Sequence, residues 1–289
     1  MRRVILVTGA SGQLGSEVIS EAAQRGLATL ALVHRSQPPV RPHDHLTGDL
    51  LQPAALARSV AAVRPAAIVH CAAWTDLGRC EHQPFLAHMA NSEATRRLSL
   101  LARELVIPLV FVSTDFVFDG REGDYREEAL PHPLNEYGKT KAMAERHVIA
   151  CGGAVVRSTF YGQRLLDHIL QSLRTGTATA SAERRYTPIA VDELARVLLD
   201  LLRLGRSGTF HAASHPALSP LDLARLAAGA YGFTPEAVRP SPPGSRDGVE
   251  RPRDSSLDGG RLDRLLGRRF QSPEEGVSRL CRSIHSTRR

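Results

Sequence analysis

The feature that most constrains the fold is a glycine-rich turn between an apolar run and a helical pattern. Residues 8–15 read Thr-Gly-Ala-Ser-Gly-Gln-Leu-Gly and follow the apolar run at residues 3–7. Glycine permits a tight turn, and a helix that starts there presents free N–H groups and its positive dipole end to a phosphate. This order of strand, turn and helix is typical of dinucleotide-binding folds. We therefore expect the turn to contact a cofactor diphosphate through Gly9, Ser11, Gly12, Gln13, Leu14 and Gly15.

Short apolar runs alternate with helical patterns along the first half of the chain. The expected strands are residues 3–7, 28–33, 67–70, 109–112 and 154–157. The expected crossover helices are residues 13–25, 53–63, 84–105 and 136–150. Such alternation is typical of βαβ units and of a parallel sheet covered by helices on both faces. The sequence therefore predicts an α/β fold with a doubly wound, Rossmann-like parallel sheet.

The alternation weakens after Gly162. A helix is expected at residues 192–204 and a strand at 209–212, and a passage rich in Pro, Gly and Ser at 240–248 precedes a last helical pattern. Such a passage is typical of a loop between structured segments. We therefore expect a cofactor-binding domain over residues 1–160. Residues 161–289 should mainly form a smaller substrate-binding lobe, with a segment at about 186–212 returning to the first domain.

A tyrosine and a lysine stand four residues apart in an unusual stretch. The chain has 37 lysines and arginines, but only Lys139 and Lys141 are lysine, and both lie in the stretch Tyr-Gly-Lys-Thr-Lys that starts at Tyr137. On a helix, Tyr137 and Lys141 would share a face. A lysine ammonium can bond a ribose hydroxyl and lower the pKa of a neighbouring phenol. We interpret Tyr137 as a proton donor and Lys141 as its partner.

The end of the second expected strand indicates the cofactor. NAD-selective sites usually carry an acidic residue there to bond the ribose 2′-hydroxyl. Here no acidic residue occurs between Glu21 and Asp44, and the strand is followed by His34, Arg35 and Ser36. A guanidinium can pair with a 2′-phosphate. Arg35 and Ser36 therefore favour NADPH, while NADH and a merely solvated Arg35 stay open.

The composition argues against several classes of function. The net charge of +7 comes from dispersed arginines and aromatic residues make up 5%, a pattern that suits an anionic small substrate or simple arginine usage better than a nucleic-acid interface. No apolar run has the length of a membrane span or of a signal peptide core. The cysteines and histidines show no metal-ligand spacing, and the cysteines no disulfide framework. We expect a cytoplasmic protein without a bound metal or membrane contact.

The two motifs together resemble the extended short-chain dehydrogenase/reductase family, whose members depend on NAD(P). Within that family, four stretches are similar to dTDP-4-dehydrorhamnose reductases: Cys-Ala-Ala-Trp-Thr at 71–75, Ser-Thr-Asp-Phe-Val-Phe-Asp-Gly at 113–120, Pro-Leu-Asn-Glu-Tyr-Gly at 133–138 and Arg-Pro-Arg-Asp-Ser at 251–255. The resemblance spans almost the whole chain. Tyr-Arg-Glu-Glu at 125–128 also resembles the β-subunit of methionine adenosyltransferase, a relative with a chiefly regulatory role.

The resemblance implies a mechanism. The cofactor supplies a hydride to a keto carbon, while Tyr137 protonates its oxygen, Thr114 orients the carbonyl, Lys141 anchors the cofactor ribose and Asn91 supports a proton relay. Further cofactor contacts are implied at Asp49, Leu50, Ala72, Ala73 and Thr75. Substrate contacts are implied at Asp115, Phe116 and Arg251, and a structural pair with a nearby carboxylate is the alternative for Arg251.

The leading interpretation is reduction of a nucleotide-linked 4-keto-6-deoxy sugar, as in dTDP-rhamnose biosynthesis. A dehydratase or epimerase is disfavoured, because Phe116 follows Thr114 and Asp115 where related dehydratases carry a glutamate. A cofactor-binding regulatory subunit stays open, since that relative keeps the same tyrosine and lysine. Another keto substrate also stays open, because residues 161–186 are poor in the aromatic and Asn-Phe signals usual for the sugar and base sites. A homodimer is compatible with the sequence.

Overall fold

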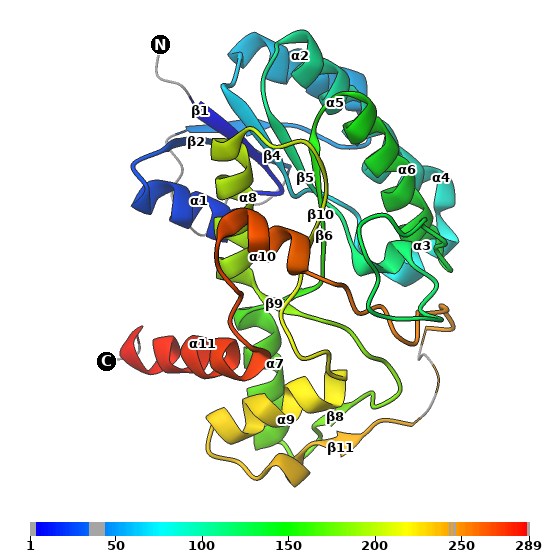
Figure 1. Cartoon of the computed structure of the whole chain (residues 1–289), viewed down its shortest axis with the longest axis vertical. Coiled ribbons are helices and arrows are strands. Elements are labelled where there is room, and N and C mark those ends of the chain that lie inside the picture. Colours follow the sequence, from blue (N-terminus) through cyan, green and yellow to red (C-terminus); the bar gives the residue numbers. More distant parts are fainter. Residues whose placement is uncertain (1–3, 35–43, 243, 245–246, 288–289) are drawn as a thin grey trace.

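The computed structural model describes residues 4–34, 44–242, 244 and 247–287, the side chains of 283–287 excepted. Its centre is a seven-stranded parallel sheet in the order β10-β6-β5-β4-β1-β2-β3. Its strands are β1 (Val4–Thr8), β2 (Ala28–Val33), β3 (Asp44–Thr47), β4 (Ala67–His70), β5 (Leu109–Val112), β6 (Ala154–Ser158) and β10 (Gly208–Ala212). The strand order reverses between β1 and β4, where doubly wound folds place their ligand (Figure 1). The predicted Rossmann-like sheet is confirmed.

Helices cover both faces of the sheet. On one face α1 (Gln13–Gln24) packs against α8 (Val191–Leu204), and on the other α5 (Ala94–Glu104) lies between α2 (Pro53–Val63) and α6 (Glu136–Ala150). In β1, Val7 belongs to the core between the sheet and helices α1 and α8, and Leu6 to the core between the sheet and helices α2, α5 and α6, because successive strand residues point to opposite faces. Within the described ranges, no helix is both long and apolar enough to cross a bilayer.

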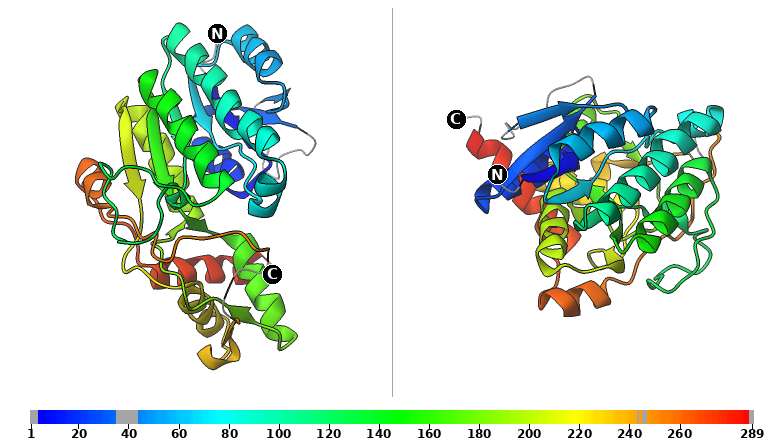
Figure 2. Two further views of the ribbon diagram at one scale, coloured as in Figure 1. Left: turned by 90° about the vertical axis from the view of Figure 1, so that its right-hand side faces the viewer. Right: turned by 90° about the horizontal axis from the view of Figure 1, so that it is seen from above.

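A separate lobe with its own core lies below the sheet in Figure 1 and in the left view of Figure 2. It is built from α7 (Gln163–Arg174), α9 (Pro220–Ala230) and α11 (Pro273–Thr287), beside the short parallel strands β8 (Thr179–Ala180) and β11 (Arg239–Pro240). A second strand pair, β7 (Phe160–Tyr161) and β9 (Ile189–Ala190), lies between this lobe and α8. The chain then returns to the sheet at β10, against which α10 (Gly260–Leu266) packs. The proposed domain limits stay a prediction.

Several parts of the chain depart from expectation. The sequence predicts one helix over residues 84–105, but α4 (Pro84–His88) is followed by a π-helical turn, η1 (Met89–Glu93), before α5 begins. The edge strand β3 was not expected, because its residues Asp-His-Leu-Thr are mostly exposed and show no apolar run. A short helix, α3 (Leu77–His82), and the amphipathic helix α7 were not assigned either. Most other predicted elements agree to within a residue or two.

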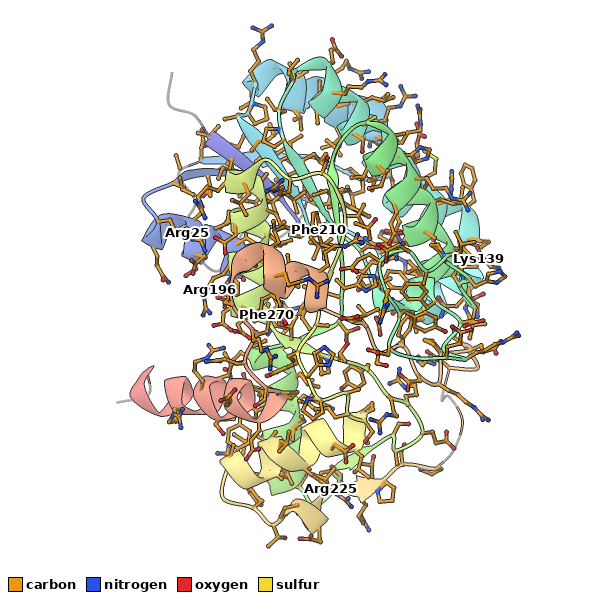
Figure 3. All side chains as sticks on the ribbon, viewed as in Figure 1. Arg25, Lys139, Arg196, Phe210, Arg225 and Phe270 are labelled. Atoms are coloured by element: carbon orange, nitrogen blue, oxygen red, sulfur yellow. The ribbon has the colours of Figure 1, made fainter. Side chains whose placement is uncertain are left out.

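Ion pairs connect α8 to neighbouring helices along one side of the molecule. Asp192, at the start of α8, accepts from Arg196 on its own helix and from Arg279 on α11. Arg25 lies 2.7 Å from Asp200 of α8, and Figure 3 shows Arg25 and Arg196 on the same side of the molecule. These partly exposed pairs contribute at most about 1 kcal/mol each. Of these, only the pair of Asp192 with Arg279 joins α11 of the smaller lobe to α8.

A buried histidine connects β1, β4 and α5 beneath the glycine turn. The His70 ring is fully buried, with Nδ1 2.6 Å from Thr8 Oγ1 and Nε2 3.0 Å from Thr95 Oγ1. Thr95 donates in turn to the Asn91 carbonyl, and Thr8 accepts from the Ala72 N–H. Burial lowers the pKa of His70 from 6.5 to about 3, so the ring is neutral in the folded protein.

We expect His70 to make the protein acid-sensitive. Between pH 6.5 and about 3 the unfolded chain binds a proton at this residue that the folded chain does not, so stability is lost as pH falls. The free energy of unfolding should fall by about 1.4 kcal/mol per pH unit from this residue alone. His70→Gln, which keeps a donor and an acceptor, should remove that share of the slope in urea unfolding between about pH 7 and pH 5. Equal slopes in both proteins would contradict this account.

Candidate active site

The glycine turn after β1 leaves the start of α1 open. Gly9 has φ +67°, and a Cβ there would lie 2.8 Å from the Ala72 nitrogen, so glycine is required by both the backbone and the close approach of the next loop. Gly12 is the N-cap of α1, with no side-chain cap and no acidic residue in the first turn. The first N–H groups of α1 are therefore available to an anion, together with the positive helix dipole.

The other residues of this turn differ in how deeply they are buried. Ser11 and Gln13 are half-buried, whereas Leu14 and Gly15 are buried in the first turn of α1. The Gln13 side chain lies against Gly162 at the start of α7, where its amide oxygen can accept from the Gln163 N–H at 2.6 Å. The Gln13 side chain thus joins the turn to the second lobe and leaves only its backbone for a phosphate.

The loop after β4 is held by Asn91 of the π-helical turn. Asn91 is buried, its Oδ1 accepts from the Trp74 N–H at 2.7 Å, and its Nδ2 donates to the Trp74 carbonyl and to Thr140 Oγ1, both at 3.0 Å. The side chain therefore connects this loop to α6. Ala73 is half-buried and Thr75 exposed in the same loop. π-Helical turns are frequent at functional sites.

The remaining cofactor contacts expected from the sequence follow strands β2 and β3. Asp49 and Leu50 follow β3 and are half-buried, and Asp49 Oδ1 accepts from the Leu51 N–H at 2.9 Å. Both residues therefore lie next to the end of β2, with which β3 pairs. Arg35 and Ser36 lie outside the described residues.

α6 begins in close contact with the turn after β5. The cap is Asn135, whose Oδ1 accepts from the Gly138 N–H at 2.9 Å. A Cβ on Gly138 would lie 2.2 Å from the Phe116 carbonyl oxygen, so only glycine allows the helix to come this near. The Phe116 and Tyr137 rings meet edge to face at 6.3 Å between centroids. This contact fixes the half-buried Tyr137 beside Thr114.

Thr114 and Tyr137 bring two hydroxyl groups together. Thr114 is 6% exposed and caps the short 3₁₀ turn η2 (Asp115–Val117), accepting from the Phe116 N–H at 3.2 Å. Burial raises the pKa of the Tyr137 phenol, a hydrogen bond with Thr114 opposes this, and the Asp115 charge adds to it. The phenol is therefore protonated at neutral pH, which a proton donor requires.

Lys141 lies one turn further along α6 and is buried. Its side chain is 2% exposed, and Nζ donates to the Val112 carbonyl at 2.6 Å and lies 3.9 Å from the centre of the Phe111 ring. Burial lowers the pKa of Lys141 to about 7, while Glu145 and Cys71 act in the opposite direction. The ammonium is thus close to losing its charge at neutral pH.

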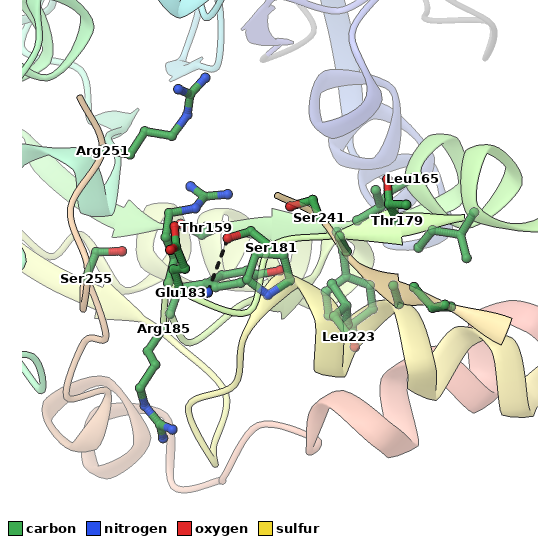
Figure 4. A pocket seen from close by; sticks show the side chains of 18 of the residues that line it. Thr159, Leu165, Thr179, Ser181, Glu183, Arg185, Leu223, Ser241, Arg251 and Ser255 are labelled. Carbon is green, nitrogen blue, oxygen red and sulfur yellow. Dashed lines mark hydrogen bonds between the residues drawn. The ribbon is translucent and has the colours of Figure 1, made fainter. Parts of the chain in front are cut away.

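Beside Thr114 the site opens into a cavity of about 1470 Å³. Its walls come from the turn after β5, from β7 and α7, and from segments within 177–186 and 241–255 (Figure 4). Asp115 and Phe116 both line it. Asp115 is buried and accepts from Ser255 Oγ at 2.5 Å, and burial raises its pKa. The segment that contains Ser255 is therefore hydrogen-bonded directly to the turn after β5.

Two arginines on the cavity wall differ in their partners. Arg251 forms a two-pronged pair with Asp247 at 2.7 and 2.6 Å, the carboxylate pairing named as the alternative for this residue. Arg184 is half-buried, its pKa is lowered by burial and by Arg251, and no carboxylate among the described residues pairs with it. Arg184 was not predicted from the sequence, because one more arginine in an arginine-rich chain gives no local signal.

Two named relatives are similar over most of the chain. A dTDP-4-keto-6-deoxy-D-glucose reductase of Streptomyces niveus is 35% identical over 247 residues, which are 82% of this chain and 82% of the relative. The methionine adenosyltransferase 2 subunit beta of Bos taurus is 31% identical over 284 residues, 92% of this chain and 84% of the relative. The chain is therefore similar both to a reductase and to a subunit of another enzyme.

A solved structure and a family profile extend the comparison. The dTDP-4-dehydrorhamnose reductase of Bacillus anthracis, solved in complex with NADP, is 25% identical, has a TM-score of 0.82, and covers 97% of this chain and 98% of its own. The profile of the RmlD substrate binding domain matches residues 1–285. The predicted kinship with dTDP-4-dehydrorhamnose reductases is confirmed. With this match over nearly its whole length, the chain belongs to the RmlD substrate binding domain family.

Proposed function

We propose that the protein is an NADPH-dependent reductase of a nucleotide-linked 4-keto-6-deoxy sugar. The observation that carries the proposal is the grouping of Tyr137, Lys141 and Thr114 at the carboxyl edge of β5, beside a large cavity. A protonated phenol, a buried ammonium and an orienting hydroxyl are what carbonyl reduction needs besides a hydride. The similarity to the Streptomyces niveus reductase supports the substrate class.

The cofactor site fits a dinucleotide diphosphate. The uncapped first turn of α1 offers N–H groups to it, and Lys141 is positioned to bond the ribose through donors that Val112 does not use. When bound, NADPH supplies the hydride that reduces the keto carbon. Thr114 orients the carbonyl, and Tyr137 transfers its phenolic proton to the oxygen, giving the alcohol and a tyrosinate. The Lys141 charge stabilises that tyrosinate until it takes up a proton from solvent.

Replacing Tyr137 by Phe should remove the proton donor. We expect turnover with NADPH and a freshly generated dTDP-4-keto-6-deoxy sugar to fall by about 10²- to 10⁴-fold, measured as loss of NADPH absorbance. Cofactor binding, followed by thermal shift, should be unchanged. Lys139→Gln is the matched control, because Lys139 is exposed and paired with Glu136. Full turnover in Tyr137→Phe would refute the assigned role.

The cofactor preference should depend on Arg35. Because its guanidinium would pair with the 2′-phosphate, we expect wild-type protein to use NADPH faster than NADH. Arg35→Gln should reduce the ratio of the two kcat/KM values by about tenfold or more, which is the loss of about 1.4 kcal/mol. An unchanged ratio would contradict the assignment of Arg35.

Arg184 should bind the anionic part of the substrate. It is half-buried in the cavity wall without a carboxylate partner among the described residues, so a diphosphate would supply the missing charge. We expect Arg184→Gln to raise KM for the nucleotide sugar by about 10- to 100-fold with little change in kcat. Arg185→Gln is the control, because Arg185 is exposed and already lies near Asp254. Equal effects of the two substitutions would contradict a specific role for Arg184.

A regulatory subunit is the second candidate, favoured by the similarity to the Bos taurus subunit beta. The two functions differ in a simple measurement. A regulatory protein would bind NADPH in a thermal-shift assay, oxidise none with keto-sugar nucleotides, and copurify with a larger synthetase. Rapid NADPH oxidation would instead favour the reductase.

A further inference from the structure

A buried ion pair lies directly behind the proposed catalytic residues. Arg157 on β6 and Glu145 on α6 are 4% exposed each, and the guanidinium donates to the carboxylate through Nε at 3.0 Å and Nη2 at 2.8 Å. The proposed mechanism does not use either residue. A pair this deep costs much desolvation energy, and removing one partner usually destabilises strongly. We therefore expect this pair to have a role other than stabilising the fold.

The carboxylate of this pair is joined to the strand that carries the site. Ser113 Oγ donates to Glu145 Oε1 at 2.6 Å, and Ser113 stands between Val112, whose carbonyl holds Lys141, and Thr114. Glu145 is also four residues after Lys141, so the two share a face of α6. One carboxylate thus contacts both the end of β5 and the helix that carries the lysine.

The charged and titratable groups around Lys141 come from three elements. On α6 the groups are Glu145, whose charge raises the pKa of Lys141, and Tyr137, whose own pKa is raised by burial. At the end of β4, burial holds His70 neutral by lowering its pKa to about 3, and burial raises the pKa of Cys71 to about 12. On β6, Arg157 lies behind Glu145 and is bonded to it. Glu145 therefore carries the one carboxylate among these groups of the described chain.

We infer that Glu145 is a positioning residue that keeps Lys141 charged and in register with the end of β5, while Arg157 and Ser113 hold the carboxylate in place. The inference deepens the proposed function, because it assumes that a charged Lys141 is what the reaction needs. Without the carboxylate, the largest influence that opposes the effect of burial on the Lys141 pKa would be lost. Lys141 would then lose its proton at a lower pH than in the wild-type protein. Above that pH the tyrosinate would have no positive charge beside it.

The two-lysine composition makes a direct test feasible. Protein labelled with ¹³C and ¹⁵N only in lysine has two side-chain signals, from Lys141 and from the exposed Lys139, whose pKa is raised by its bond to Glu136. Lys139→Arg assigns them. In Glu145→Gln we expect the Lys141 titration to move down by on the order of one pH unit, while Lys139 does not move. Glu145→Asp, which keeps the charge, should stay near wild type.

A second buried glutamate gives the matched control. Glu193 on α8 is also 4% exposed but is not among the groups that face Lys141, so Glu193→Gln should leave the Lys141 titration unchanged. If Glu145→Gln does not fold, Glu145→Gln with Arg157→Gln replaces both ions by amides, and there too the Lys141 titration should fall. An unchanged Lys141 titration in a folded variant without the Glu145 carboxylate would overturn the inference.

Turnover provides an independent measurement. With a keto substrate, the high-pH limb of kcat should move down in Glu145→Gln by the same interval as the Lys141 signal, whereas a merely structural role would lower kcat at every pH alike. The NMR titration needs no substrate. A protein without reductase activity would refute the proposed function while the Lys141 titration still decides the role of Glu145.

Discussion

The close contact between α6 and the end of β5 is the constraint on which the site depends. Gly138 lets the helix approach the Phe116 carbonyl, and the Lys141 ammonium donates to the Val112 carbonyl one turn later. β5 is an inner strand, paired with β4 and β6, so its end cannot shift without breaking the sheet. Tyr137, Lys141 and Thr114 are therefore held by a rigid strand and a rigid helix, as precise chemistry requires.

The parts of this arrangement that sequence reasoning could predict are encoded in neighbouring residues. A strand, a glycine turn and a helix follow one another at residues 4–24, and α6 spans residues 136–150 as expected. The spacing of Tyr137 and Lys141 on one helix face needs only the period of the helix. Such local patterns specify the sheet, the cofactor turn and the motif, because each is a property of consecutive residues.

The parts that escaped prediction are formed by residues far apart in the chain. Asp115 bonds to Ser255, and Glu145 bonds to Arg157, across sequence separations that no local pattern records. Because arginine is abundant in this chain, nothing in the sequence distinguishes Arg184 or Arg157 from the other arginines. The π-helical turn at Asn91 was missed for another reason, since its sequence is compatible with an ordinary helix and only the bonds to Trp74 show what the turn does.

The two lysines show why rarity alone is a poor guide to chemistry. Lys139 is half exposed and its Nζ lies 2.6 Å from Glu136, a surface pair in which arginine would serve as well. Lys141 is buried. An arginine there would have five N–H donors that need acceptors, and its guanidinium would stay protonated at every physiological pH. A compact ammonium needs fewer partners, and one of its three donors is already used by Val112. Burial, not sequence rarity, is therefore what makes lysine necessary at position 141.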